Sequence, residues 1–166
     1  MIRRQALFGI SGALSAAVWA NAEEPRPRTP HLAIGNYGMK TLSLEDAIHE
    51  IAAIGFGAWE CCAIAEWDST PARMGAARRK TVAGLLQNHQ LRLAAVMENL
   101  PPQPENEKHQ TTLTRMRDAI ELGRDLAEGT RPLVQTVLGG GQWDEEKSMF
   151  RDRVGDWARL AKQHEA

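Results

Sequence analysis

Carboxylate, amide and indole side chains stand in or just after four short apolar runs of the sequence. The carboxylates are Glu60 and Glu98, and the other side chains belong to Asn36, Trp67, Asn99, Gln135 and Trp143. A carboxylate at the end of a strand can bind a hard metal ion, act as a general base or hold a hydroxyl group of a ligand. A tryptophan beside it can form the apolar wall of a ligand site. The alternative is that these carboxylates are surface or packing groups and the tryptophans only cover loops, so the sequence assigns no catalytic residue.

The cysteines and histidines of the chain do not form a metal-binding pattern. Cys61 and Cys62 are adjacent, and neighbouring residues of a strand point to opposite faces. Two small buried residues are therefore a better interpretation than a vicinal disulfide, although an oxidising compartment would permit one. His49, His89 and His109 fall on or beside expected helices, where a solvated or capping role is predicted. We expect no metal site within this chain.

Two further clusters each have a simple interpretation and a more specific one. The run Gly139–Gly141 could cradle a phosphate at the start of a helix. No lysine accompanies it, and a flexible turn is favoured. The cationic cluster Arg78–Lys80 is predicted to be the solvated face of a helix.

The four apolar runs alternate with amphipathic segments of helical period. Strands are expected over residues 31–37, 57–64, 91–97 and 132–138, and helices over 44–54, 72–88, 106–127 and from 144 onward. The first helix has the clearest boundaries, with Ser43 as its N-cap and Gly55 as the residue that ends it. Its apolar stripe consists of Leu44, Ala47, Ile48, Ile51 and Ile54. Alternation of this kind predicts an α/β fold with parallel strands joined by right-handed helical crossovers.

Composition and length restrict the fold and the function. The chain has 166 residues, a formal net charge of −1 and two cysteines, which excludes a disulfide-rich scaffold and does not favour nucleic acid as a partner. Parallel repeats form either an open doubly wound sheet or part of a closed barrel. No GxGxxG follows the first strand and no GxxxxGKS/T occurs, which weakens a dinucleotide-binding or P-loop interpretation. A complete eight-stranded barrel has about 250 residues, well above this length.

The first residues of the chain have the pattern of an export signal. The pair Arg3–Arg4 precedes an apolar run that is short for a membrane span, and Ala20–Ala22 forms a small-x-small cleavage site. The arginine pair fits the twin-arginine route incompletely, and a Sec signal or an uncleaved anchor is the alternative. The sequence predicts residues 1–22 as signal peptide, residues 23–30 as a Pro-rich linker, and a periplasmic product that leaves the membrane after cleavage.

Three stretches of the chain resemble the sugar phosphate isomerase/epimerase family, which consists of xylose isomerase-like TIM barrels. They are Leu42–Glu60, with LSLEDAI and IGFGAWE at its two ends, Leu85–Leu93 (LLQNHQLRL) and Asp118–Leu126 (DAIELGRDL). The resemblance covers about residues 31–165. It implies that residues 31–166 form the N-terminal half of such a barrel, about four units of a (β/α)8 fold. Because barrel active sites lie at the C-terminal ends of the strands, the carboxylates, amides and tryptophans named first become candidates for a substrate pocket.

The resemblance also implies a function for a complete protein. Family members isomerise or epimerise sugars with a divalent metal ion, Mn²⁺, Mg²⁺ or Zn²⁺, whose ligands come mainly from the later strands. Met97–Asn99 stands where members often carry a histidine, which argues against a metal site of the endonuclease IV type. We therefore expect a small sugar or sugar derivative as ligand, no cofactor for this chain alone, and no activity from it alone. The alternative is a non-catalytic half barrel that binds a ligand and self-associates through its open sheet edges.

Overall fold

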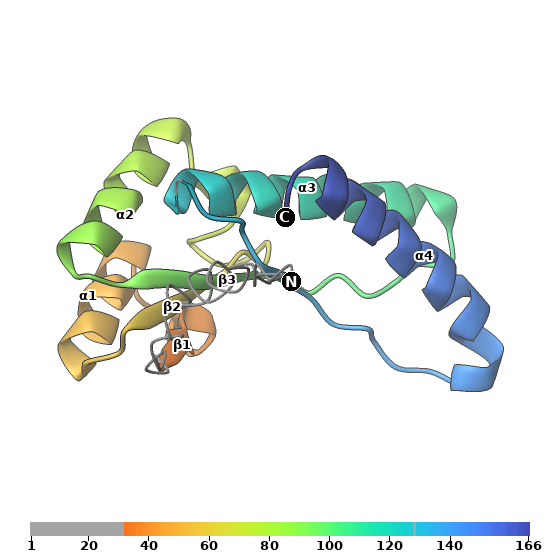
Figure 1. Cartoon of the computed structure of the whole chain (residues 1–166). Coiled ribbons are helices and arrows are strands. Elements are labelled where there is room, and N and C mark those ends of the chain that lie inside the picture. The colour runs from red at the N-terminus through yellow and green to blue at the C-terminus, as the bar shows by residue number, and fades with distance from the viewer. Residues whose placement is uncertain (1–31, 128) are drawn as a thin grey trace, which may run out of the picture. The chain divides into compact units, whose positions relative to one another are not determined.

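The chain folds as a parallel β-α repeat (Figure 1). The computed structural model describes residues 32–127 and 129–166. Within these residues there are four strands, β1 (Ala33–Gly35), β2 (Ala58–Cys62), β3 (Arg92–Met97) and β4 (Val134–Gln135), which form one sheet in the order β1-β2-β3-β4. Every pairing in it is parallel, as the sequence predicts, with one register shift between Trp59 and Glu60. The predicted signal peptide (1–22) and linker (23–30) lie outside the described residues.

Helices make the connections between the strands. They are α1 (Leu44–Ile54), α2 (Ala76–Asn88), α3 (Asn106–Leu126) and α4 (Trp143–Gln163), with short 3-10 turns η1 (Asn36–Met39) and η2 (Pro71–Arg73). Figure 1 shows α2 and α3 on the same side of the strands. None of the helices in the described part of the chain has the length and apolarity that a membrane crossing requires.

Helix α1 begins and ends where its sequence predicts. The Ser43 hydroxyl accepts a hydrogen bond from the Asp46 backbone N–H at 3.1 Å, which satisfies one of the free donors of the first turn. Gly55 ends the helix with φ at +98°, a conformation that a glycine adopts without strain. The predicted apolar stripe is buried except for Ile54, which is 63% exposed because the last turn extends beyond the core. The prediction that Ile54 belongs to the buried stripe is therefore wrong.

β1, β4 and α2 lose the most of their predicted length, each for a local reason, and β2 is also three residues shorter than predicted. Strand β1 ends at Gly35 because the chain turns into η1, and β4 keeps only two residues since it pairs on one side only. Helix α2 begins at Ala76 rather than residue 72. Pro71 opens a separate 3-10 turn there, and Gly75 then takes the N-cap position of the helix in an extended conformation.

The main core lies between the helices and one face of the sheet. It contains Leu44, Ile48 and Ile51 of α1, Val82 and Leu86 of α2, Ala119, Leu122 and Leu126 of α3, and Trp59, Cys61 and Val96 of the strands. Trp59 is the largest fully buried side chain. A second cluster joins α3 to α4 through Met116, Ile120, Leu100 and Trp157. The helices therefore bury one face of the sheet only.

The opposite face of the sheet is lined mainly by small residues. Side chains alternate along a strand, so the neighbours of the buried Trp59 and Val96 point away from the helices. These side chains surround an open hollow of about 280 Å³ lined by Ala33, Ile34, Gly35, Glu60, Ala94, Ala95, Leu133 and Gln135. Leu133 is 63% exposed there. In a closed barrel this face would be the interior, which is normally filled by side chains from all the strands.

A buried histidine links α3 to α4, contrary to the prediction of a solvated His109. Its side chain is only 1% exposed, and its Nε2 lies 2.9 Å from the Asp156 carboxylate. The Asp156 carboxylate also contacts Arg159, and the hydrogen bond with His109 holds the pKa of Asp156 below its usual value. His109 occupies a position on the inner side of α3 that its sequence neighbourhood does not distinguish from a surface position.

Glycine is required at position 123 because α3 approaches the chain before β4 there. A Cβ at Gly123 would lie 2.6 Å from the Pro132 Cβ and 3.2 Å from a Val96 methyl group. We expect Gly123→Ala to lower the free energy of unfolding by about 1–3 kcal/mol, the usual cost of overpacking.

The matched control for this prediction is Gly84→Ala in α2, where a Cβ meets nothing within 4 Å. It should raise stability by about 0.5–1 kcal/mol, because alanine favours a helix over glycine. Urea unfolding followed by circular dichroism compares the two variants. Equal effects of the two substitutions would contradict the close packing of α3 on the sheet.

Candidate functional site

Two of the predicted site residues meet in the hollow on the open face of the sheet. Glu60 on β2 and Gln135 on β4 both line it, with Gly35 beside Glu60. A Cβ at Gly35 would come within 2.7 Å of the Glu60 carboxylate, so the small residue leaves room for that side chain. Within residues 32–127 and 129–166, no basic side chain forms an ion pair with Glu60. A half-buried carboxylate and an amide in a hollow can hold the hydroxyl groups of a small polar ligand.

Asn36 lies directly after β1, but its polar atoms form hydrogen bonds within the protein and are not free to bind a ligand. It is 4% exposed. Its Oδ1 accepts hydrogen bonds from Trp59 Nε1 at 3.1 Å and from the Cys62 backbone N–H at 2.9 Å, and its Nδ2 donates to Ser69 Oγ at 2.9 Å. The Ser69 hydroxyl in turn donates to the Cys62 carbonyl at 2.6 Å. Asn36 thereby joins β1, β2 and the loop after β2 at the C-terminal edge of the sheet.

Trp67 stands at the same edge within a small aromatic cluster. Its ring stacks on Tyr37 with centroids 5.0 Å apart, and its Nε1 donates to the Tyr37 carbonyl at 3.0 Å. Lys40 lies 4.5 Å above the Trp67 ring and pairs with Glu66 at 2.6 Å. Tyr37 is 54% exposed. Sequence reasoning anticipated the tryptophan, but no pattern in the sequence indicated that Lys40 and Glu66 accompany it.

Glu98 follows β3 and turns toward α3 rather than into the hollow. It is 2% exposed, and its Oε2 accepts a hydrogen bond from Arg115 Nη2 at 2.6 Å and another from the Asn99 backbone N–H at 3.2 Å. Burial raises the pKa of the Glu98 carboxyl, and the attraction of Arg115 opposes that rise. Asn99 itself is exposed and lines a separate hollow beside α3 together with Arg115 and Lys108.

Trp143 lies apart from all these groups. It is the first residue of α4, it is 65% exposed, and its ring contacts Phe150 edge-on with centroids 6.2 Å apart. The structure therefore brings together Glu60 with Gln135, and Glu98 with Asn99. It places Trp143 elsewhere.

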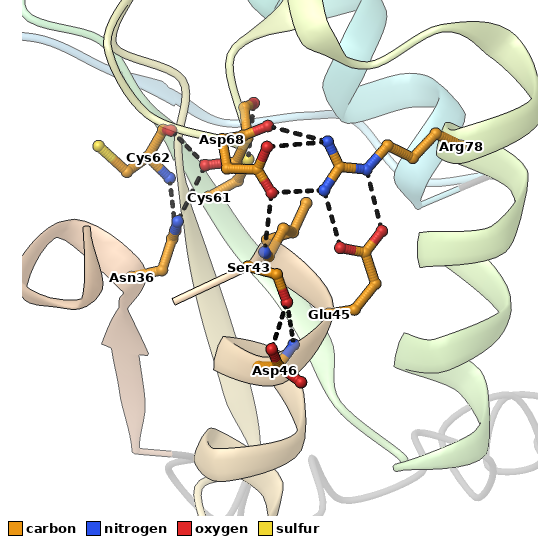
Figure 2. Close-up of polar contacts among 10 residues, drawn as sticks. Asn36, Ser43, Glu45, Asp46, Cys61, Cys62, Asp68 and Arg78 are labelled. Atoms are coloured by element: carbon orange, nitrogen blue, oxygen red, sulfur yellow. Dashed lines mark hydrogen bonds and ion pairs between the residues drawn. The ribbon is translucent and has the colours of Figure 1, made fainter. Parts of the chain in front are cut away.

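The prediction of a solvated helix face is wrong for both arginines of the cationic cluster. Arg79 is only 18% exposed and donates to the Met74 carbonyl at 2.6 Å and to Asp125 at 2.7 Å. Arg78 forms a half-buried clamp. Figure 2 shows the Arg78 guanidinium between two carboxylates. Its Nε and Nη2 donate to Glu45 of α1 at 2.9 and 2.7 Å, and its Nη1 and Nη2 donate to Asp68 at 3.0 and 2.5 Å. Asp68 also accepts from the Leu44 backbone N–H at 3.0 Å. The clamp thus fixes the loop after β2 to the starts of α1 and α2.

The clamp has a consequence at low pH. The hydrogen bonds from Arg78 lower the pKa of Asp68 from 3.8 to about 2, against the opposing effect of burial. Since the folded pKa is lower than the unfolded one, the stability from Asp68 is complete above about pH 3.8 and is lost as the pH falls through about 2. We expect Asp68→Asn to lose less stability than the wild type between pH 4 and pH 2.

The control for the acid experiment is Asp144→Asn, because the Asp144 side chain is 90% exposed. Urea midpoints measured at intervals of pH give the comparison. If Asp68→Asn and Asp144→Asn follow the wild-type curve equally, the Arg78 clamp does not exist in solution.

The adjacent cysteines are confirmed as free, buried residues. Cys61 and Cys62 are at most 1% exposed and form no disulfide with each other. Burial raises the pKa of both thiols, so neither is a thiolate at neutral pH. They pack the sheet and carry no nucleophile or metal ligand.

The residues around the hollow do not by themselves fit the divalent metal ion that the family resemblance implies. In the part of the chain that the structure describes, no three His, Cys, Asp or Glu side chains gather closely enough to hold one. Of the two candidate carboxylates, Glu98 is occupied by Arg115 and only Glu60 faces the hollow. A hard cation takes about six oxygen ligands, more than this face offers.

The arrangement of strands, helices and hollow defines half of a TIM barrel. No family model matches the chain, and no curated protein matches its sequence. Among solved structures it is similar to D-psicose 3-epimerase with D-tagatose from Clostridium cellulolyticum H10, with a TM-score of 0.63 and 12% sequence identity.

The extent of that similarity fits the expectation of a half barrel. It covers 81% of this chain and 50% of the epimerase chain, so the chain spans about half the length of the structure it matches. At 12% identity the similarity shows the fold. The predicted α/β fold, with about four parallel β-α units that match half of a TIM barrel, is confirmed.

Proposed function

We propose that the chain supplies the first half of an exported, sugar-binding barrel of the isomerase/epimerase type. The observation that carries this proposal is the hollow in which Glu60 and Gln135 face outward from a sheet with the fold of half an epimerase barrel. A carboxylate and an amide can accept and donate hydrogen bonds to vicinal sugar hydroxyls. Export to the periplasm rests on the signal-like residues 1–22.

In a complete protein this half would act with later strands and a divalent metal ion to isomerise or epimerise a sugar. Moving a proton between carbons beside a carbonyl requires at least one positioned base and a group that stabilises the developing charge. Within the described face only Glu60 is available as a base, because Glu98 is held by Arg115. We therefore expect no turnover of ketoses or aldoses by this chain alone, with or without Mn²⁺ or Mg²⁺.

Titration of the ¹⁵N-labelled chain with D-tagatose tests the sugar-binding part of the proposal. Amide shifts should concentrate on β2 and β4 around the hollow. Glu60→Gln should weaken the interaction by about tenfold or more, since a hydrogen bond to a charged group contributes about 1.5–3 kcal/mol.

The matched control is Glu50→Gln, a change of the same kind at an exposed residue of α1. It should leave the titration unchanged. Shifts confined to the Tyr37–Trp67 stack, or equal losses in the two variants, would contradict a sugar site in the hollow.

A second function is favoured by the two free edges of the sheet. Among residues 32–127 and 129–166, β1 and β4 each pair on one side only, and exposed edges and apolar patches favour association. Two copies could close these edges against each other as a non-catalytic binding module. Sedimentation velocity over a range of concentrations distinguishes the functions, because self-association predicts a concentration-dependent dimer.

A further inference from the structure

Two histidines from different helices face each other on the surface of the protein. His49 stands on α1, and His89 is the C-cap residue of α2. The Nε2 of His89 lies 2.9 Å from the Nδ1 of His49, and the two rings meet at 85° with centroids 4.8 Å apart. Neither ring is buried. The two imidazoles share a single hydrogen bond. Because neither ring is buried, water and ions can reach this contact.

The helices hold these two side chains in place. Ile48, the residue before His49, and Leu86, three residues before His89, are both part of the main core. The His89 backbone N–H donates to the Leu85 carbonyl at 3.0 Å, which fixes the end of α2. Because both imidazoles are attached to helices that are fixed by the core, they stay close to each other, and less freedom is lost when they bind a shared ligand.

The spacing of the ring nitrogens fits two ligands of one transition metal ion. Imidazole nitrogens bind such ions at about 2.0–2.1 Å. Two ligands at that distance and at a right angle are about 2.9 Å apart, whereas a tetrahedral angle separates them by about 3.3 Å. The observed 2.9 Å between His49 and His89 is the length of their hydrogen bond, and it places both nitrogens close enough to bind one ion once that bond is broken.

We propose that His49 and His89 form a two-histidine site for a divalent transition metal ion at the junction of α1 and α2. Small rotations of the rings point both nitrogens at one ion, and water completes its coordination. The site takes Ni²⁺, Cu²⁺ or Zn²⁺ in preference to Mg²⁺ or Mn²⁺, because imidazole favours the former ions.

This site is independent of the proposed sugar site. His89 comes three residues before β3 begins, so the pair lies near the amino ends of the strands. The carboxyl ends, where barrel enzymes bind their substrates, are at the other edge of the sheet. The metal ion would join two helices and carry no part of a sugar reaction.

Isothermal titration of the untagged protein with NiCl₂ at neutral pH tests the site. We expect one ion per chain and a rise in melting temperature, because the ion binds only the folded junction. His49→Ala and His89→Ala should each weaken binding by about a hundredfold, since one imidazole no longer gains from the effective concentration of the other. MgCl₂ should give no saturable heat.

The matched control is His164→Ala, at the C-cap of α4, which should leave Ni²⁺ binding unchanged. His49→Gln and His89→Gln serve as second variants that keep a polar side chain, and circular dichroism confirms that each variant is folded. Unchanged Ni²⁺ affinity in the variants at positions 49 and 89, or an equal loss in His164→Ala, would overturn the site.

Discussion

Trp59→Ala is expected to destabilise the protein by about 4 kcal/mol, a typical cost of removing a large buried aromatic side chain. Trp59 is fully buried at the centre of β2, where α1 and the neighbouring strands pack around it. Because small domains have total stabilities of about 5–15 kcal/mol, this variant should lose a large share of its stability and unfold at a much lower urea concentration. Urea unfolding followed by circular dichroism measures the change.

Trp59→Phe separates the volume of the ring from its hydrogen bond. It keeps most of the packing but removes the Nε1 donor to Asn36. We expect it to cost about 1–2 kcal/mol, well below the alanine variant. If Trp59→Ala and Trp59→Phe have the same unfolding midpoint, the core between helices and sheet is not centred on this residue.

Asn36→Ala is expected to cost about 3 kcal/mol, the second largest effect. The substitution leaves two buried donors, Trp59 Nε1 and the Cys62 backbone N–H, without their acceptor. Each buried donor without a partner costs about 1–3 kcal/mol. It also removes the donor to Ser69 Oγ, which frees the loop after β2. Hydrogen exchange of the Cys62 amide should accelerate along with the loss of global stability.

Asn99→Ala is the control, since Asn99 is an exposed amide at the equivalent place after β3. It should change stability by no more than about 0.5 kcal/mol. A stable Asn36→Ala variant with a protected Cys62 amide would mean that Asn36 is free to meet a ligand, as the sequence alone allowed.

The sequence predicted the fold well because its signals are local. The cap at Ser43 and the turn at Gly55 fix α1, and regular alternation of apolar runs with amphipathic segments predicts parallel β-α units. Strand lengths were predicted poorly, since the end of a strand depends on its neighbours. β1 ends where the Asn36 side chain accepts a hydrogen bond from the Cys62 backbone N–H of β2. This contact joins residues far apart in the sequence, so no local pattern predicts it.

The sequence predicted which residues lie near the C-terminal ends of the strands, but it predicted only partly which of these side chains contact one another. The rule that barrel sites follow the strands found Glu60 and Gln135, which do share a hollow. It could not show that Glu98 turns to Arg115, because that partner is 17 residues further along the chain on α3. For the same reason Arg78 looked like a solvated residue, although its two partners come from other segments.

The half-barrel architecture rests on a sheet of which the described part of the chain covers one face only. Its most direct test is the rate of thiol labelling in Ala94→Cys, because Ala94 is exposed and lines the hollow. The native cysteines are buried and supply the slow reference within the same protein. We predict labelling near the rate of a free thiol at low protein concentration. Slow labelling at position 94 in a protein that stays monomeric would mean that the face is covered, and would contradict the account.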